Sequence, residues 1–285
     1  MALGILSTGF GLGFATTGWL FPVLVSSFSW RFCWYVLGAW ALIMILVNGI
    51  FLRSGPEDLQ MSPWGEEEDD LLEDLKGEGS VRDDLHPTEE ARYGEIFRSS
   101  RFWTIGASYF FISCALYVIT TFMVDYANVE LGFSFKEASF LATIHGLGQV
   151  VGVLTIPILS DQIGRRLTLM ISNVFIALGT VGVIASAESI PILSASIALL
   201  GIFYGITWPM YGACGGDYFR KEVMGTVIGA WTPFYGLGAI LAHLITGRIR
   251  DITQSFQLAF CLAVLFALVA AFLMHRVKRP GEGNR

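Results

Sequence analysis

The chain has 285 residues, of which 54% are hydrophobic and 15% are charged. Soluble domains carry about 25% charged residues, so this composition excludes an ordinary soluble fold. The net charge of -6 at pH 7 reflects one acidic segment. The basic residues are too dispersed to form a nucleic-acid-binding surface, so no nucleic-acid partner is expected.

Uncharged stretches of at least 21 residues succeed one another along the chain. There are eight of them: 1–30, 32–52, 102–124, 138–160, 167–187, 189–216, 223–247 and 252–274. A helix needs ~20 apolar residues to cross a bilayer, and in lipid the backbone must satisfy its own hydrogen bonds. The sequence therefore predicts an all-α, polytopic membrane protein with eight transmembrane helices in a lipid bilayer.

A hydrophilic segment separates the second stretch from the third. Residues 57–95 contain 15 of the 24 acidic residues. Such a composition buries too little apolar surface to offset the entropy of ordering. We expect a solvated, partly disordered linker, and a regulatory or partner-binding role is the alternative.

The basic residues between the stretches predict the orientation. If the start of the chain is taken as inside, the inside connections hold 14 of the 18 Lys and Arg residues and the outside connections hold 4. Cytoplasmic loops carry the excess of Lys and Arg. We therefore expect both termini in the cytoplasm of an integral protein of the cell (inner) membrane.

Motifs for cofactors, metals or catalysis are missing from the sequence. The four cysteines form no Cys-x-x-Cys pair and resemble small apolar packing residues. There is no phosphate-binding loop, Gly-x-Ser-x-Gly or His-Glu-x-x-His motif. We expect no cofactor, no metal and no enzymatic activity.

Five short motifs resemble the major facilitator superfamily, and the clearest lies between the fourth and fifth stretches. It reads Ser160-Asp161-Gln162-Ile163-Gly164-Arg165-Arg166 and is similar to the family's Asp-x-x-Gly-Arg-Arg/Lys loop. The other four are Trp30-Arg31, Arg53-Ser54-Gly55-Pro56-Glu57-Asp58, Gly216-Asp217-Tyr218-Phe219 followed by Gly225-Thr226-Val227-Ile228-Gly229, and Gly247-Arg248-Ile249-Arg250-Asp251. The branch that the chain most resembles is monocarboxylate-transporter-like and oxalate/formate-antiporter-like.

The resemblance implies that the chain supplies helices five to twelve of a twelve-helix carrier. Residues 1–52 would be the last two helices of the N-terminal bundle, 53–98 an acidic cytoplasmic central loop, 99–276 a six-helix C-terminal bundle and 277–285 a cytoplasmic tail. Each half of this fold contains inverted three-helix repeats, and the substrate site lies between the halves near the bilayer midplane. We interpret the sequence as N-terminally truncated. The alternative is a genuine eight-helix protein that completes its site by oligomerising.

The loop signature predicts a gate. Gly164 permits a tight turn, and Arg165 and Arg166 can pair with Asp161 and with helix C-termini. Such a cluster can hold one packing of helices and release another. Two positions depart from the family pattern, which has glycine at Pro157 and a basic residue at Gln162.

Polar and aromatic residues deep in the stretches are the candidate substrate-binding residues, because polar groups in lipid are costly and usually functional. They are His145, Gln149, Tyr204, Trp208, Trp231 and Tyr235. His145 and Gln149 lie four residues apart on one helical face, which suits hydrogen bonding to substrate or proton coupling. Packing between helices is the alternative for the pair. Tyr and Trp need hydrogen-bond partners at depth, and Pro209 and Pro233 would open the backbone beside them.

The resemblance also bears on the substrate. Anion carriers of this branch use an arginine in the eighth helix and some use a lysine in the eleventh. Here the first position reads Gly152-Val153, and the stretch 223–247 has no lysine. Either the cation lies outside this chain or the substrate is neutral.

The predicted function is secondary active transport of a small organic solute, which could be a carboxylate. Transport would proceed by alternating access and be coupled to a proton or a counter-solute. The alternative is a non-transporting membrane protein: a truncated paralogue, a scaffold or a sensor acting through the acidic loop.

Overall fold

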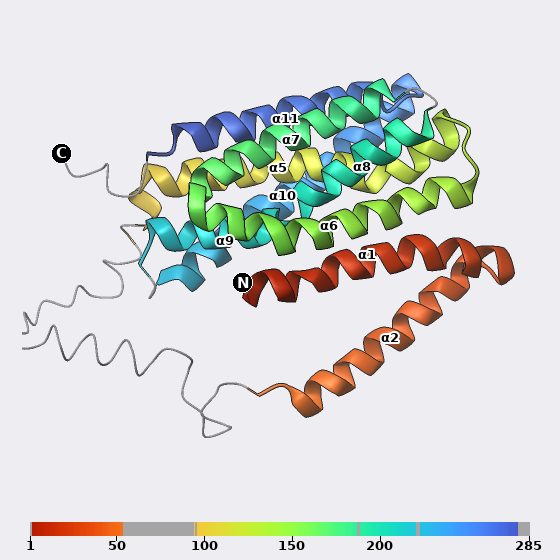
Figure 1. Cartoon of the computed structure of the whole chain (residues 1–285), viewed down its shortest axis with the longest axis horizontal. Coiled ribbons are helices and arrows are strands. Elements are labelled where there is room, and N and C mark those ends of the chain that lie inside the picture. Colours follow the sequence, from red (N-terminus) through yellow and green to blue (C-terminus); the bar gives the residue numbers. More distant parts are fainter. Residues whose placement is uncertain (1, 54–93, 95, 187–188, 221–222, 279–285) are drawn as a thin grey trace, which may run out of the picture. The chain divides into compact units, whose positions relative to one another are not determined.

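The structure is a computed structural model that describes residues 2–53, 94, 96–186, 189–220 and 223–278. Its elements are α1 (Ala2–Ser27), α2 (Trp30–Phe51), α5 (Ser100–Asp125), the π-helix η2 (Tyr126–Glu130), α6 (Phe135–Ile163), α7 (Arg165–Ala185), α8 (Ile190–Gly205), α9 (Thr207–Tyr218), α10 (Met224–Thr253) and α11 (Gln257–Arg276). Figure 1 shows them in chain order. The acidic segment lies almost entirely outside the described residues, so its predicted disorder stays a prediction.

The predicted membrane-spanning helices are confirmed. Eight segments of the described chain are long and apolar enough to cross a membrane; η2 extends the span of α5, and α8 and α9 together form another. Large apolar side chains such as Leu178, Leu244 and Phe272 are 54%, 64% and 58% exposed. Water would not favour such a surface, whereas lipid does, so the chain is an integral membrane protein.

The chain divides into two compact units. One combines residues 1–23 with 92–285, and the other covers residues 24–91. The described part of the second unit includes α2, whose apolar side chains are largely exposed. The predicted domain boundaries at residues 52, 98 and 276 are not tested by this division and stay a prediction.

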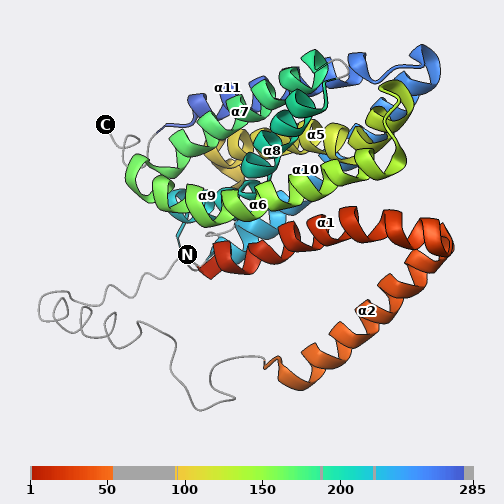
Figure 2. The same ribbon diagram turned by 45° about the vertical axis from the view of Figure 1, so that its right-hand side comes forward.

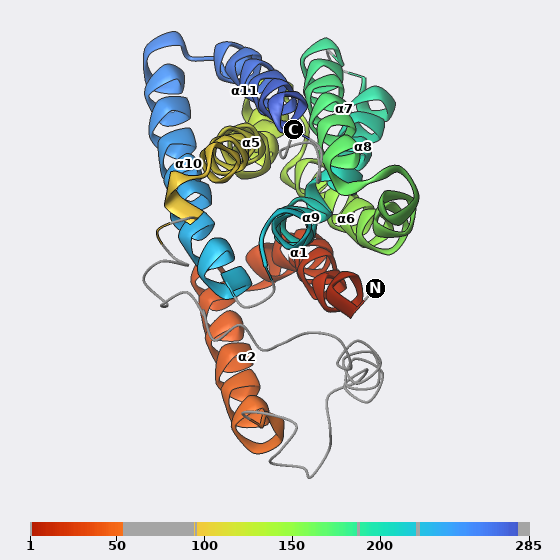
Figure 3. The same cartoon turned by 90° about the vertical axis from the view of Figure 1, so that its left-hand side faces the viewer.

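Six long helices of the first unit form an arc. Viewed along the bundle, α10, α5, α11, α7, α8 and α6 follow one another as neighbours (Figure 3). The pairing of α6 with α8 is also visible after a smaller rotation (Figure 2). Helix α9 contacts α5, α7, α8 and α10, so it lies between the two ends of the arc.

Glycines allow α6 to approach its neighbours closely. A Cβ atom at Gly148 would lie 2.7 Å from the carbonyl oxygen of Ala198 on α8. On the α1 side, a Cβ at Gly11 would lie 2.7 Å from the carbonyl oxygen of Gly146. Small residues are typical where membrane helices pack backbone to backbone. We call the close contacts of α6 with α1 and α8 at Gly146, Gly148 and Gly152 the glycine seam.

A carboxylate joins the end of α5 to the start of α11. Glu130, the last residue of η2, accepts hydrogen bonds from the backbone N–H of Phe256 at 2.6 Å and from the Ser255 hydroxyl at 3.1 Å. The Arg250 guanidinium lies 3.8 Å from the same carboxylate. A carboxylate at a helix N-terminus accepts hydrogen bonds from free N–H groups and interacts favourably with the helix dipole. Glu130 therefore holds the end of η2 against the start of α11.

Candidate functional site

A cavity of about 230 Å³ opens where α8 gives way to α9. We call it the central cavity. It is lined by Ser7, Phe10, Phe14, Tyr117, Gln149, Tyr204, Gly205, Trp208, Pro209 and Tyr235. These residues come from α1, α5, α6, α8, α9 and α10, so the cavity gathers side chains from most of the first unit. Among the described residues that line it, none carries a charge.

Four predicted binding residues meet in the central cavity. Gln149, Tyr204, Trp208 and Tyr235 all line it. Gln149 is 3% exposed. The structure thus brings together an amide, phenol hydroxyls and an indole, all of which can donate hydrogen bonds.

The break between α8 and α9 brings backbone polar groups to the cavity. Helix α8 ends at Gly205 and α9 begins at Thr207, so the last carbonyls of one and the first N–H groups of the other lie beside Gly205 and Trp208. Pro209 at the third helical position has no N–H and cannot continue the ladder. The break was expected from this proline. A helix N-terminus carries a partial positive charge, which is the nearest substitute here for a cationic side chain.

His145 lies behind the cavity wall. It is 0% exposed, and neither ring nitrogen has a hydrogen-bond partner among the described residues. Its ring packs edge to face against Phe14 at 5.3 Å and Tyr204 at 5.1 Å between centroids. Both of those neighbours line the cavity. A buried polar group without a partner is costly and rare, so this histidine is the least satisfied side chain near the site.

Trp231, the sixth predicted residue, does not line the central cavity. It is 1% exposed and its indole N–H donates to the carbonyl oxygen of Phe102 at 3.1 Å. Its ring forms part of a neighbouring cavity. The structure therefore separates it from Gln149, Tyr204 and Tyr235.

Two lining residues with a hydroxyl group, Tyr117 and Ser7, were absent from the predicted set. Tyr117 had a signal, since it lies two helical turns from Tyr109 on one stripe. Its ring packs against that of Tyr235 at 5.7 Å between centroids. Ser7 had none, because a serine in a glycine-rich stretch is indistinguishable from a packing residue.

The predicted gate residues form a cluster where α6 joins α7. Gly164 adopts φ 90° and ψ 140°, a conformation that L side chains rarely adopt. Arg165 forms an ion pair with Asp217 of α9 and lies 3.8 Å from Asp161. Arg166 donates to the carbonyl oxygens of Met274 at 3.1 Å and of His275 at the C-terminal end of α11. We call Asp161, Arg165, Arg166 and Asp217 the latch cluster.

Asp217 has a larger part in this cluster than the sequence indicated. Its position in the motif Gly216-Asp217-Tyr218-Phe219 was noted, but not its pairing with Arg165. The pair joins the start of α7 to the end of α9, whereas Arg165 and Asp161 join only consecutive helices. Because all three side chains are at least 30% exposed, each ion pair contributes little to stability in isolation.

Known proteins resemble the chain along its whole length. A sequence profile of the Major Facilitator Superfamily matches residues 1–135 and 105–285. The Hexuronate transporter of Bacillus subtilis is 21% identical over 99% of this chain and 66% of its own length. Monocarboxylate transporter 12 of Rattus norvegicus is 24% identical over 96% of this chain and 58% of its own length.

A third relative is the Cis,cis-muconate transport protein of Acinetobacter baylyi, which is 24% identical over 87% of this chain and 57% of its own length. The chain thus spans between 57% and 66% of the length of these three relatives. All three are named as transporters, in agreement with the predicted class of protein. Since the family profile covers the whole sequence, the chain belongs to the major facilitator superfamily.

Proposed function

We propose that the chain takes part in secondary active transport of a small organic acid by alternating access. The observation that carries the proposal is the central cavity of about 230 Å³, which gathers hydrogen-bonding side chains from several helices at mid-span. The names of the relatives support the substrate class, because they refer to a monocarboxylate, a muconate and a hexuronate.

The acid group would be held by neutral donors. A carboxylate accepts hydrogen bonds, and the Gln149 amide, the Tyr204 and Tyr235 hydroxyls and the N-terminal end of α9 can supply them. Since none of the described lining residues is cationic, the negative charge would need compensation from another source. A proton carried with the acid supplies it most simply, and exchange against a second anion is the other solution.

His145 is the proposed proton-coupling residue. Its ring packs against Phe14 from α1 and against the phenol ring of Tyr204 from α8. A neutral imidazole suits this closed arrangement, because a charged one would be buried without a counter-charge. If α1 moves away from α6 during transport, the imidazole gains access to water and can take up a proton.

The latch cluster is the proposed gate at the cytoplasmic end, with both termini on that side. Arg165 joins α7 to α9, two helices that otherwise make few contacts, and Arg166 adds a link from α7 to the end of its close neighbour α11. Exposed ion pairs contribute about 0.2 to 1 kcal/mol each. Such contacts can break and re-form at little cost as the helices tilt.

Uptake into liposomes reconstituted with the full-length gene product tests this function. We expect saturable uptake of a small monocarboxylate such as lactate or benzoate. Uptake should be faster when the interior of the liposome is more alkaline than the medium outside. Gln149→Ala should raise KM about threefold to tenfold, the loss of one or two hydrogen bonds. The matched control is Gln257→Ala, an exposed glutamine at the start of α11.

Three outcomes separate the alternatives. Uptake that ignores a pH gradient but requires internal anion would favour exchange. Equal KM for the two glutamine variants would remove the central cavity from substrate binding. Absence of both uptake and binding, together with a cellular response lost when residues 57–90 are deleted, would favour the sensor.

A further inference from the structure

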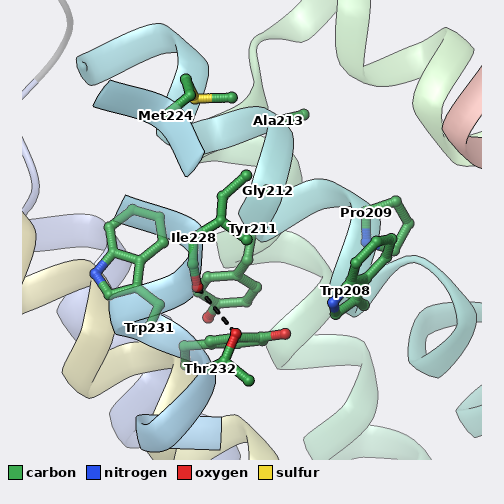
Figure 4. Close-up of a pocket in the computed structure, with 10 residues that line it drawn as sticks. Trp208, Pro209, Tyr211, Gly212, Ala213, Met224, Ile228, Trp231 and Thr232 are labelled. Atoms are coloured by element: carbon green, nitrogen blue, oxygen red, sulfur yellow. Dashed lines mark hydrogen bonds between the residues drawn. The ribbon is translucent and has the colours of Figure 1, made fainter. Parts of the chain in front are cut away.

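A second cavity, of about 120 Å³, lies between α5, α9 and α10. We call it the aromatic cavity. It is lined by Tyr109, Trp208, Pro209, Tyr211, Gly212, Ala213, Met224, Ile228, Trp231 and Thr232. Figure 4 shows Trp231 on one side and Trp208 with Pro209 on the other, with Tyr211 between them. The rings therefore face a common space.

Three polar groups of its walls are bonded to other residues. The Trp231 N–H donates to the carbonyl oxygen of Phe102. The Tyr211 hydroxyl lies 2.6 Å from the Ser108 hydroxyl, which itself donates to a backbone carbonyl on α11. The Thr232 hydroxyl donates to the carbonyl oxygen of Ile228 at 3.0 Å (Figure 4). These walls consequently offer ring faces and aliphatic groups to an occupant.

The wall is also rigid. The Trp231 ring stacks on Phe102 at 5.9 Å between centroids, and the Tyr211 ring stacks on Tyr109 at 4.5 Å. A hydrogen bond and a stacking partner hold each ring in one orientation. The space between them is therefore a preformed apolar cavity of the kind that small-molecule sites provide.

The aromatic cavity adjoins the central cavity. Trp208 and Pro209 belong to the walls of both. A second link is the contact between Tyr109 of one cavity and Tyr235 of the other, whose ring centroids are 4.6 Å apart. A molecule that is held by Gln149 and Tyr235 and extends past Trp208 would reach the aromatic cavity.

We propose that the aromatic cavity receives the apolar body of the transported acid, whose carboxylate lies in the central cavity. This rests on the proposed function and narrows its substrate class to small amphipathic acids with a ring or short chain of about six carbons. The cavity, at about 120 Å³, is somewhat smaller than the apolar cavity of about 150 Å³ that accommodates benzene, so a single ring or a short chain is the largest body that it suits. Polyhydroxylated acids are disfavoured, because their hydroxyl groups would lose water and find few partners on these walls.

Gly212 offers a direct way to fill the cavity. A Cβ atom built there would meet only the Cδ1 of Ile228, at 3.9 Å, so a side chain can enter without distorting the backbone. Replacing a glycine within a helix also favours folding. Gly212→Leu should therefore keep the fold and occupy the space. Gly229→Leu is the matched control, since a Cβ there meets nothing within 4 Å and the position is exposed on α10.

Calorimetric titration of the purified chain with three acids tests the proposal. Benzoate, cyclohexanecarboxylate and glucuronate share one carboxylate and differ in the body. We expect the first two to bind at least about tenfold more tightly than glucuronate, because burial of carbon surface favours them. Gly212→Leu should remove this preference and Gly229→Leu should retain it.

The results separate this proposal from the broader one. If glucuronate binds as tightly as the apolar acids, or if Gly212→Leu leaves the preference intact, the aromatic cavity is not a substrate subsite although the transporter role stands. If Gln149→Ala weakens all three acids equally while Gly212→Leu affects only the apolar two, both proposals are supported. If none of the acids binds, both fail.

Discussion

Replacement of His145 by leucine should make the protein more stable and less active. The imidazole is fully buried, and its two nitrogens have no hydrogen-bond partner in the described structure. A buried polar group without a partner costs about 1–3 kcal/mol. Leucine has a similar volume and no polar atom, so His145→Leu removes that cost at both nitrogens without leaving a large cavity.

The gain is reduced by lost ring contacts. His145 packs edge to face on Phe14 and Tyr204, and such pairs contribute about 0.5–1.5 kcal/mol each. The relief at two nitrogens is about 4 kcal/mol at the middle of its range and the loss of two ring pairs about 2 kcal/mol, which leaves a net stabilisation of about 2 kcal/mol. For a domain of this size each kcal/mol corresponds to roughly 2–4 °C in Tm.

Thermal unfolding in detergent, followed by tryptophan fluorescence, measures the change. His145→Ala is the cavity control and should lose about 2–5 kcal/mol, as large-to-small core substitutions do. His243→Leu is the control for a histidine whose nitrogens have hydrogen-bond partners. The His243 nitrogens contact the Thr121 hydroxyl at 2.9 Å and the Ala239 carbonyl oxygen at 2.6 Å, so His243→Leu should not raise the stability of the protein.

A lower Tm for His145→Leu would refute the reasoning, because it would mean that the imidazole is satisfied in the folded protein. The predicted loss of activity is measured by uptake into liposomes. His145→Leu should abolish the acceleration of uptake by a pH gradient. If stability rises while that acceleration persists, the histidine is a packing residue and not the coupling group.

Three further predictions concern the contacts between helices. Glu130→Ala should lower stability by about 2 kcal/mol, because it leaves the Phe256 N–H at the start of α11 without its partner, and Glu130→Gln should lose about half as much because the amide oxygen still accepts. Arg165→Ala and Asp217→Ala should each lower Tm by about 1–3 °C, and the double variant should cost no more than either one. Gly152→Leu should prevent folding or lower Tm by many degrees, because its Cβ would overlap the backbone of α8.

For each of these three predictions, a different experimental result would contradict the reasoning. Equal stabilities of the alanine and glutamine variants at Glu130 would mean that the charge, and not the hydrogen bond, matters. Additive losses at Arg165 and Asp217 in a double-mutant cycle would mean that the two side chains act independently. Gly225→Leu, where a Cβ meets nothing within 4 Å, should be tolerated, and an equal loss there would mean that helix glycines matter for flexibility rather than close packing.

The number and limits of the spans could be predicted because membrane helices must be long and uncharged. The break beside Trp208 was also expected, since Pro209 cannot continue the hydrogen-bond ladder. The grouping of Gln149, Tyr204, Trp208 and Tyr235 was only a hypothesis, because which faces of separate helices meet depends on their packing. Trp231 shows what the sequence could not predict. Its position deep in an apolar stretch indicated a site residue, but nothing in the sequence indicates that its N–H bonds to Phe102 or that its ring faces a different cavity.

The glycine seam has a consequence for how the chain can vary. Gly146, Gly148 and Gly152 face backbone atoms of α1 and α8, so even one methyl group has no room there. The rings and amides of the cavities have neighbours that can repack, and a change of substrate can be accommodated by exchanging them. Substrate specificity can therefore change by substitution of the cavity residues while the glycine seam stays the same. The positions least open to replacement would then be those without any side chain.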